Sequence, residues 1–568
     1  MSDDLKWWRN SIIYHIYPRS FCDSNGDGIG DLSGIISKAE YVKWLGVDAI
    51  WMGPVFQSPQ VDNGYDISDY LTVDPSFGSN QDLYNLISTY HSHGLRVILD
   101  LVLNHTSDQH EWFAESRRSQ DSRRADYYIW RSPAANGDPP NSWKAVFGGS
   151  AWTYCETRDQ YYLHLFSPAQ PDLNWECPEV REEIGNILQF WLEKGADGFR
   201  LDVINHISKH PDFPDLNGGS PNGIFVDGPE TLRFLQDLRT RVRSANEIAK
   251  SNSPTEDRVF LVGETPGVSP DAAQEYTDPK SDALDSVIVF DHLGVDHSPS
   301  GKWEPRQWTV NELSDVVTSW QETLAEPRWP TVYMSNHDQP RVVSRYGNDS
   351  DFRSESAVAL AAYFYLQRGT PIVYQGDEIA MRNYPIRSYE DLQDIESRDA
   401  FQTLQKAYAD CPEKVMDRIR YSARDNGRTP MQWNSETNAG FCAPDSRPWY
   451  PVNPDHRDWN VEAMQSDRAS VLNRNRDILA LRKTEPFVSG EFRALAANES
   501  AAAYLRVSDA KKALVIVSLS SEPAVLTIPE TSITELLFSN YDSSNVDGSM
   551  VLSDVRLRPF EAIVATVS

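Results

Sequence analysis

The sequence predicts an α/β protein, a closed (β/α)8 (TIM) barrel with an inserted domain after strand 3 and a C-terminal all-β sandwich domain. Eight short apolar runs alternate with connections long enough to hold helices, which is typical of a closed barrel. Five of these runs end in charged or histidine residues, and such barrels carry their reactive groups at the carboxyl ends of the strands. Beyond about residue 490 the pattern changes to short alternating strands, which indicates a sandwich.

The eight predicted strands share short length and β-branched or aromatic content, and they cover residues 12–18, 49–53, 96–104, 198–203, 260–264, 286–290, 331–338 and 371–378. The fourth run, GFRLDV, alternates apolar side chains with Arg200 and Asp202. An inward-facing arginine and carboxylate would cost several kcal/mol if they served packing alone. The run therefore indicates a functional site, with a structural ion pair as the alternative.

The strand positions divide the chain into domains. Residues 1–104 and 176–489 are assigned to the catalytic barrel, which carries a second long insertion at about 379–458 after the eighth strand. Residues 105–175 are rich in aromatic residues, Pro and Gly and show no long helical pattern, so they are read as an inserted domain B. Residues 490–568 form the predicted C-terminal sandwich.

Composition narrows the classes of partner. The 568 residues carry a formal net charge of -30, which argues against nucleic acid and anionic membranes as partners and fits a neutral small molecule. No window approaches 18 apolar residues, and the charged N-terminus lacks the apolar region of a secretory signal. The five widely spaced cysteines fit reduced thiols. We expect a cytoplasmic protein that is a monomer or a weak homo-oligomer.

Three carboxylates, two histidines and an arginine end four of the predicted strands, and these residues are Asp202, Glu264, Asp338, His105, His337 and Arg200. Glycoside cleavage needs one carboxylate to attack or stabilise an oxocarbenium-like centre and one carboxylic acid to protonate the leaving oxygen. A serine hydrolase would need a GxSxG turn, and a metallohydrolase of the HExxH class would need that motif; neither is present. The set therefore favours a glycosidase.

The segments DLVLNH (100–105), GFRLD, GE and NHD, together with QPDLNW (170–175), resemble the α-amylase-type glycoside hydrolases, specifically the oligo-1,6-glucosidase and α-glucosidase branch. The resemblance implies a retaining mechanism with Asp202 as nucleophile, Glu264 as general acid/base and Asp338 as transition-state stabiliser. Retention predicts Asp202 and Glu264 carboxyls roughly 5 Å apart. We expect Arg200 to keep Asp202 ionised, and a drier environment to keep Glu264 protonated.

The same resemblance implies how the sugar is held. Arg200, His105 and His337 would bind the glucosyl unit and the nucleophile. Asp62 and Arg424 would grip the far side of the terminal glucose and close the pocket, which makes the enzyme exo-acting. Tyr65 and Phe166 match aromatic positions around that sugar, with core packing as the alternative, and Arg428 is interpreted as structural.

The loop DSNGDGIGD places oxygen-bearing side chains at alternate positions, like the first half of an EF-hand loop without its closing Glu. The resemblance implies a structural Ca²⁺ held by Asp23, Asn25, Asp27, Asp31 and the carbonyl of Ile29. A solvated turn is the alternative interpretation. No organic cofactor is expected.

Val203, directly after the proposed nucleophile, goes in this branch with a preference for α-1,6 links, so we expect isomaltose-like substrates. The alternatives are an α-1,4-preferring maltase or sucrose-active enzyme, and a transglucosidase or sucrose isomerase. The segment HLGVD (292–296) lacks the arginine-rich motif of sucrose isomerases and the lysine of trehalose-6-phosphate hydrolases. A non-enzymatic transporter-associated homologue is a remote alternative, because such proteins carry a membrane anchor and have lost catalytic carboxylates.

Overall fold

The computed structural model describes residues 6–250, 259–541 and 550–568. Each of the eight predicted barrel strands is present, as β1 (Ile13–Ile16), β2 (Ala49–Met52), β5 (Arg96–Val102), β9 (Gly198–Asp202), β10 (Phe260–Glu264), β11 (Ser286–Ile288), β14 (Thr331–Tyr333) and β15 (Thr370–Tyr374). They form one parallel sheet in the order β11-β10-β9-β5-β2-β1-β15-β14. The predicted barrel is confirmed.

The first and last strands of this sheet, β11 and β14, contact each other and close the barrel. Side chains bridge the seam to main-chain carbonyls. The hydroxyl of Thr331 donates to the Val287 carbonyl at 2.7 Å, and that of Tyr333 donates to the Val289 carbonyl at 2.8 Å. These bonds satisfy carbonyls that a regular ladder would otherwise pair.

The barrel interior is filled by inward side chains from most of the strands, so it is a packed core and not a channel. Ile13, Ile98 and Ile372 belong to this cluster. Trp7 and Trp8 precede β1 and pack in the same cluster, with the ring of Trp8 stacked on Phe260 at a centroid distance of 5.1 Å. The indole rings of Trp7 and Trp8 therefore close the barrel at the end where its strands begin.

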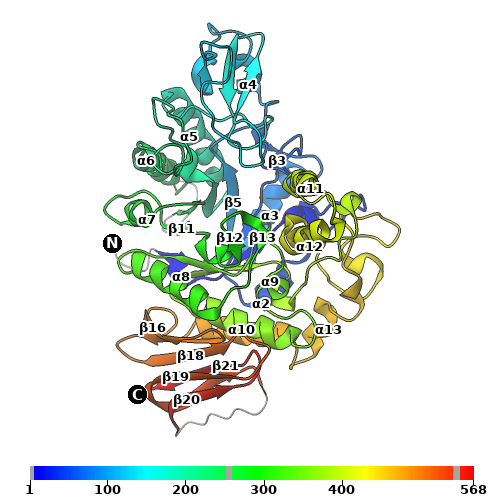
Figure 1. Cartoon of the computed structure of the whole chain (residues 1–568), viewed down its shortest axis with the longest axis vertical. Coiled ribbons are helices and arrows are strands. Elements are labelled where there is room, and N and C mark those ends of the chain that lie inside the picture. The colour runs from blue at the N-terminus through cyan, green and yellow to red at the C-terminus, as the bar shows by residue number, and fades with distance from the viewer. Residues whose placement is uncertain (1–5, 251–258, 542–549) are drawn as a thin grey trace.

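Helices surround the barrel (Figure 1), among them α1 (Leu32–Ser37), α2 (Ala39–Leu45), α3 (Asn80–Ser92), α5 (Pro178–Glu193), α6 (Thr231–Lys250), α7 (Pro270–Thr277), α8 (Val310–Thr323), α9 (Val342–Arg345), α10 (Arg353–Tyr365) and α14 (Val471–Arg482). Ser79 and Asp82 form a capping box at the start of α3, and Thr309 and Glu312 form one at α8. Helix α10 is buried on nearly every face because it lies between the barrel and the C-terminal sheet.

The connection after β5 holds helix α4 (Glu111–Ser116) and a small antiparallel sheet of β6 (Trp130–Arg131), β7 (Trp152–Cys155) and β8 (Gln160–Leu163) in the order β6-β8-β7. It stands apart from the barrel at the top of Figure 1. Its own core includes Trp143, Trp152 and Leu163, and Phe213 from the loop after β9 packs against it.

The remaining elements of the catalytic part are two hairpins and the insertion after β15. The hairpins are β3 (Phe56–Gln57) with β4 (Asp69–Val73), and β12 (His297–Ser298) with β13 (Gly301–Pro305). The insertion contains α11 (Ile395–Ala407) and α12 (Pro412–Ser422), and α13 (Val461–Ser466) precedes the last barrel helix. Within the described residues, no helix is long and apolar enough to cross a membrane.

The C-terminal part is all-antiparallel, with β16 (Glu491–Ala497), β17 (Ala501–Val507), β18 (Lys512–Ser518), β19 (Ala524–Ser539), β20 (Val551–Leu557) and β21 (Ala562–Val567). The long strand β19 pairs with β20 through its first half and with β21 through its second half. It also contacts β16 and β17, which are not its sheet neighbours. The sheet thus folds over an apolar core as a sandwich.

Candidate active site

Arg200 on β9 joins three carboxylates from adjacent strands. Its Nη1 donates to Asp202 Oδ1 at 2.7 Å and to Asp100 Oδ1 at 2.9 Å. Its Nη2 lies 2.7 Å from Glu264 Oε1. The exposed fractions of Asp202 and Glu264 are 6% and 5%. Because one guanidinium contacts both, the two carboxyls face the same space at the carboxyl ends of β9 and β10, as a two-carboxylate mechanism requires.

Three carboxylates sharing one guanidinium change the expected protonation. Burial raises the pKa of Asp202 well above its ordinary value, Arg200 lowers it, and Glu264 and Asp100 raise it again. Burial also raises the pKa of Asp100. Arg200 acts on Asp202 in the expected direction, since it lowers the pKa, but burial first and then the Glu264 and Asp100 carboxylates act against it.

Val203 follows Asp202 in a left-handed backbone conformation, with φ 36° and ψ 41°. A β-branched residue is strained in this region. The turn directs the Val203 N–H at Glu264, where it donates to Oε2 at 3.1 Å. The residue that the sequence singled out for linkage preference therefore also holds the proposed general acid/base through its main chain.

Asp338 contacts one histidine and two arginines. His337 Nε2 lies 3.1 Å from Oδ2, while Arg424 Nη1 and Arg428 Nη2 donate to Oδ1 at 3.0 and 2.7 Å. Burial would raise the pKa of Asp338, but the histidine and the two arginines outweigh it and hold the pKa well below its usual range. Asp338 is thus a carboxylate that stays ionised readily.

Arg428 was interpreted as structural, and that interpretation is incomplete. Besides Asp338, it donates to Asp394 Oδ2 at 2.8 Å, and Arg424 donates to the same oxygen at 2.7 Å. The two arginines lower the pKa of Asp394 despite its burial. Asp394, the N-cap of α11, thereby fixes both guanidinium groups against Asp338.

Asp62 is joined to this group of residues through Arg424 and Gln170. Arg424 Nη2 lies 3.3 Å from Asp62 Oδ1, and Gln170 donates to Asp62 Oδ2 at 3.1 Å. These three residues come from the loop after β2, the insertion after β15 and the inserted domain. Burial raises the pKa of Asp62 to about 7, against the lowering effect of Arg424 and Arg428.

The remaining predicted residues complete one chain of contacts. The Tyr65 ring stacks on His337 at 5.2 Å, and its hydroxyl donates to Asp100 at 3.1 Å. His105 Nε2 lies 3.1 Å from the Tyr65 carbonyl, and Phe166 packs on the His105 ring at 5.1 Å. Burial lowers the pKa of His105 to about 4, so it is neutral near pH 7. The predicted catalytic and sugar-binding residues thus surround one site.

The predicted metal loop lies apart from this site, against residues 441–449 of the insertion. The carboxylate of Asp23 accepts from the amides of Asn25, Gly26 and Gly28, and Asp31 caps α1. Within the described residues, no three Asp, Glu, His or Cys side chains converge as a metal cluster. Asp23 and Asp31 are buried and form no ion pair in that part of the chain, although main-chain amides donate to both; their net negative charge fits a bound cation whose other ligands are amide and carbonyl oxygens.

Sequence reasoning assigned no role to three residues of the site, namely Asp100, Gln170 and Asp394, and gave Arg428 a structural role only. Asp100 begins a quoted motif, but its place opposite Arg200 comes from the β5–β9 register, which the sequence does not supply. Gln170 belongs to a quoted motif. Asp394 gave no pattern, since its partners lie 30 and 34 residues along an irregular insertion.

The fold and the site together define a barrel glycoside hydrolase whose two proposed catalytic carboxylates, Asp202 and Glu264, contact one guanidinium. Residues 15–490 match the family model described as alpha amylase, catalytic domain, and the chain belongs to this family. It is 45% identical to the oligo-1,6-glucosidase of Parageobacillus thermoglucosidasius, over 98% of each chain.

Solved structures agree with the family assignment. Trehalose-6-phosphate hydrolase of Bacillus licheniformis has a TM-score of 0.92 and 36% identity, over 99% of this chain and 100% of that one. Isomaltulose synthase of Protaminobacter rubrum also has a TM-score of 0.92, with 35% identity over 99% of both chains.

Proposed function

We propose that the protein is an exo-acting, retaining α-glucosidase that releases glucose from the non-reducing end of short oligosaccharides and prefers α-1,6 links. The observation that carries the proposal is the shared contact of Asp202 and Glu264 with Arg200, which fits the short carboxyl separation of about 5 Å used in retention. The Asp62–Arg424 contact supports exo action, because it bounds one side of the space that the proposed catalytic residues surround.

The proposed reaction has two steps. Asp202 attacks the anomeric carbon while Glu264 gives its proton to the glycosidic oxygen, so the aglycone leaves as an alcohol and a glucosyl ester forms on Asp202. Glu264, now a carboxylate, then takes a proton from water, whose oxygen attacks the same carbon and releases glucose and free Asp202. The ionised Asp338 stabilises the positive charge that develops on the ring in both steps.

The linkage preference rests on Val203 and on relatives named oligo-1,6-glucosidase. The pocket difference between linkages is worth about 1–3 kcal/mol, so it is a preference and not an exclusion. Kinetics on isomaltose, maltose, sucrose, trehalose, trehalose 6-phosphate and panose test it. We expect faster hydrolysis of isomaltose than of maltose, and a tenfold preference for maltose or sucrose would overturn it.

The enzyme assignment itself is tested with p-nitrophenyl α-glucoside. Asp202→Asn should abolish its hydrolysis, because the amide is a poor nucleophile. Retention is checked by following the anomeric form of the first glucose released by NMR. Release of β-glucose, or unchanged activity of the variant, would contradict the mechanism.

We further propose a structural Ca²⁺ on the loop of Asp23, Asn25, Asp27, Ile29 and Asp31, supported by the alternating oxygen ligands and by two buried carboxylates that have no ion-pair partner among the described residues. It would stabilise the loop and take no part in the reaction. We also propose a cytoplasmic protein that is a monomer or weak homo-oligomer, for which the acidic composition and the free cysteines are the support.

A further inference from the structure

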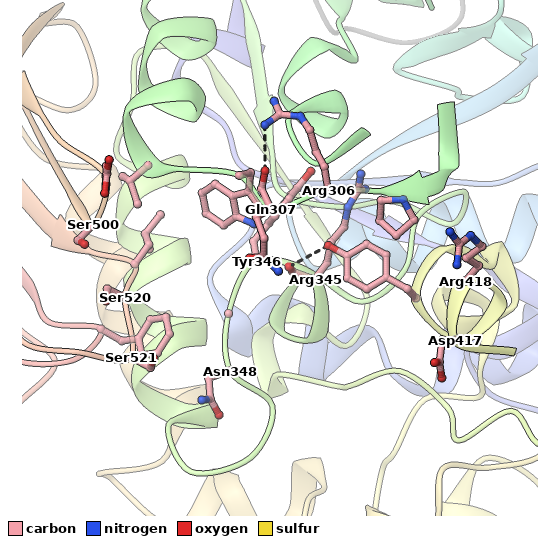
Figure 2. A pocket seen from close by; sticks show the side chains of 18 residues that line it. Arg306, Gln307, Arg345, Tyr346, Asn348, Asp417, Arg418, Ser500, Ser520 and Ser521 are labelled. Carbon is pink, nitrogen blue, oxygen red and sulfur yellow. Dashed lines mark hydrogen bonds between the residues drawn. The ribbon is translucent and has the colours of Figure 1, made fainter. Parts of the chain in front are cut away.

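A groove of about 720 Å³ lies where the barrel, helix α12 and the C-terminal sandwich meet. Figure 2 shows Arg345 and Tyr346 at its centre, Ser500, Ser520 and Ser521 on one side, and Arg418 on the other. None of its lining residues belongs to the contact network of the candidate active site. The groove is therefore a separate space, of a size typical of small-molecule sites.

The three cationic side chains that line this groove are all paired with carboxylates. Arg345 contacts Asp296 at 2.6 Å, Arg306 contacts Glu312 at 2.9 Å, and Arg418 contacts Glu304. Two further carboxylates, Asp417 and Glu499, also line the groove. Positive charge at the groove is thus offset, which disfavours a phosphate or carboxylate ligand and favours a neutral one.

The groove offers features that match a polyhydroxylated ligand. Trp308 is partly exposed and is held edge-to-face on Tyr346, with ring centroids 5.2 Å apart and an interplanar angle of 77°. Gln307, Ser500 and Ser521 present uncharged donors and acceptors beside it. A partly exposed indole beside uncharged hydroxyl and amide groups fits a ligand that supplies hydroxyl oxygens and an apolar face.

We propose that this groove is a second binding site for a neutral oligosaccharide, separate from the site of hydrolysis. Its volume suits a ligand of two or three sugar units, with one pyranose face on Trp308 and hydroxyls toward Gln307 and Ser500. This goes beyond the proposed glucosidase activity, because hydrolysis does not require the groove. Ligands of the two sites share their chemistry, so the enzyme would hold an oligosaccharide on the sandwich side of the barrel while another is cleaved.

The test is titration of isomaltotriose into the full-length enzyme saturated with 1-deoxynojirimycin, a glucose-shaped inhibitor that occupies the active site and prevents turnover. We expect residual binding with Kd on the order of 1 mM, as suits one ring contact and a few hydrogen bonds. Trp308→Ala should weaken this binding roughly three- to tenfold. Gln307 is exposed, so Gln307→Ala should fold normally and also weaken binding.

Tyr154→Ala is the matched control, because Tyr154 is an exposed aromatic of the inserted domain, and it should leave the binding unchanged. The kcat/KM for isomaltose should stay within twofold in all three variants. Three results would overturn the proposal: absence of residual binding, an affinity in both groove variants equal to that of the wild type, or displacement of isomaltotriose by inorganic phosphate. Failure of the glucosidase assignment would show instead as absent hydrolysis by the wild-type enzyme, an independent readout.

Discussion

At the scale of single residues, Asp62 is a carboxyl whose charge depends on pH near neutrality. Burial raises its pKa to about 7, although Arg424 lies 3.3 Å away. An unfolded Asp releases its proton near pH 3.9, so between about pH 4 and 7 the folded state holds one proton more than the unfolded state. The stability contributed by this group is complete below that window and is lost as pH rises through about 7.

We therefore expect Asp62→Asn to alter the pH dependence of stability. The wild type should lose stability relative to the variant between pH 5 and pH 8, because the amide has no charge to gain. Thermal unfolding of both proteins at the two pH values gives the gap between their unfolding temperatures, and the change of this gap with pH measures the effect. A gap between the two unfolding temperatures that does not change with pH would show that Asp62 does not titrate in this range.

Arg428 is a second residue-scale case, because it donates to Asp338, Asp394 and the His337 carbonyl. Arg428→Lys keeps the charge but loses the planar fork that makes these bonds together. We expect kcat to fall roughly 10–100-fold and the protein to lose about 2–4 kcal/mol of stability.

The control for that variant is Arg468→Lys, whose side chain is exposed and paired only at the surface. It should change kcat by less than twofold. If Arg428→Lys lowered the unfolding temperature but left kcat and its pH profile unchanged, Arg428 would be structural, as the sequence interpretation held.

At the scale of elements, the seam between β11 and β14 is held by side chains. Thr331→Val removes the bond to the Val287 carbonyl while keeping the shape of the residue, so the carbonyl loses a buried partner. We expect a loss of about 1–3 kcal/mol, measured as a lower urea midpoint. Thr534→Val, which removes an exposed bond to Thr566, should cost much less. An equal effect of the two changes would contradict this account of the seam.

The metal loop gives the second element-scale prediction. Chelation by EDTA should lower the unfolding temperature by several degrees and leave kcat unchanged at a temperature where the protein stays folded, because the loop lies outside the active site. Added Ca²⁺ should restore the original value. Identical unfolding curves with and without EDTA would favour the solvated turn.

The strands could be predicted because their alternating or fully apolar runs are local patterns, and Gly198–Asp202 shows both faces: Phe199 and Leu201 in the outer core, Arg200 and Asp202 inside. The order of motifs then indicated which strand ends meet. The contacts of Asp394 with Arg424 and Arg428 were not predictable, because an irregular insertion has no period. The pKa of Asp202 depends on a third carboxylate, Asp100, which only the strand register brings to Arg200.

At the scale of the whole molecule, the net charge of -30 acts on stability. Like charges repel within the folded state, and salt screens them, with a Debye length of about 30 Å at 0.01 M and about 10 Å at 0.1 M. We expect the unfolding temperature to rise between 0.01 and 0.5 M NaCl. Glycerol at equal osmolality is the control for a solvent effect without charge. A flat or falling response to NaCl would show that local ion pairs outweigh the general repulsion.

The packed interior of the barrel, closed at one end by Trp7 and Trp8, leaves no passage through it, so a sugar reaches the candidate site from the side of the carboxyl ends of the strands. In the proposed reaction, the aglycone must therefore depart before glucose can, and the incoming molecule must arrive by the route just vacated. Water and a second sugar molecule therefore compete for the glucosyl ester by the same route. At high sugar concentration the glucosyl unit should pass to another sugar and give products longer than the substrate. In dilute solution it should pass to water and give only shorter products.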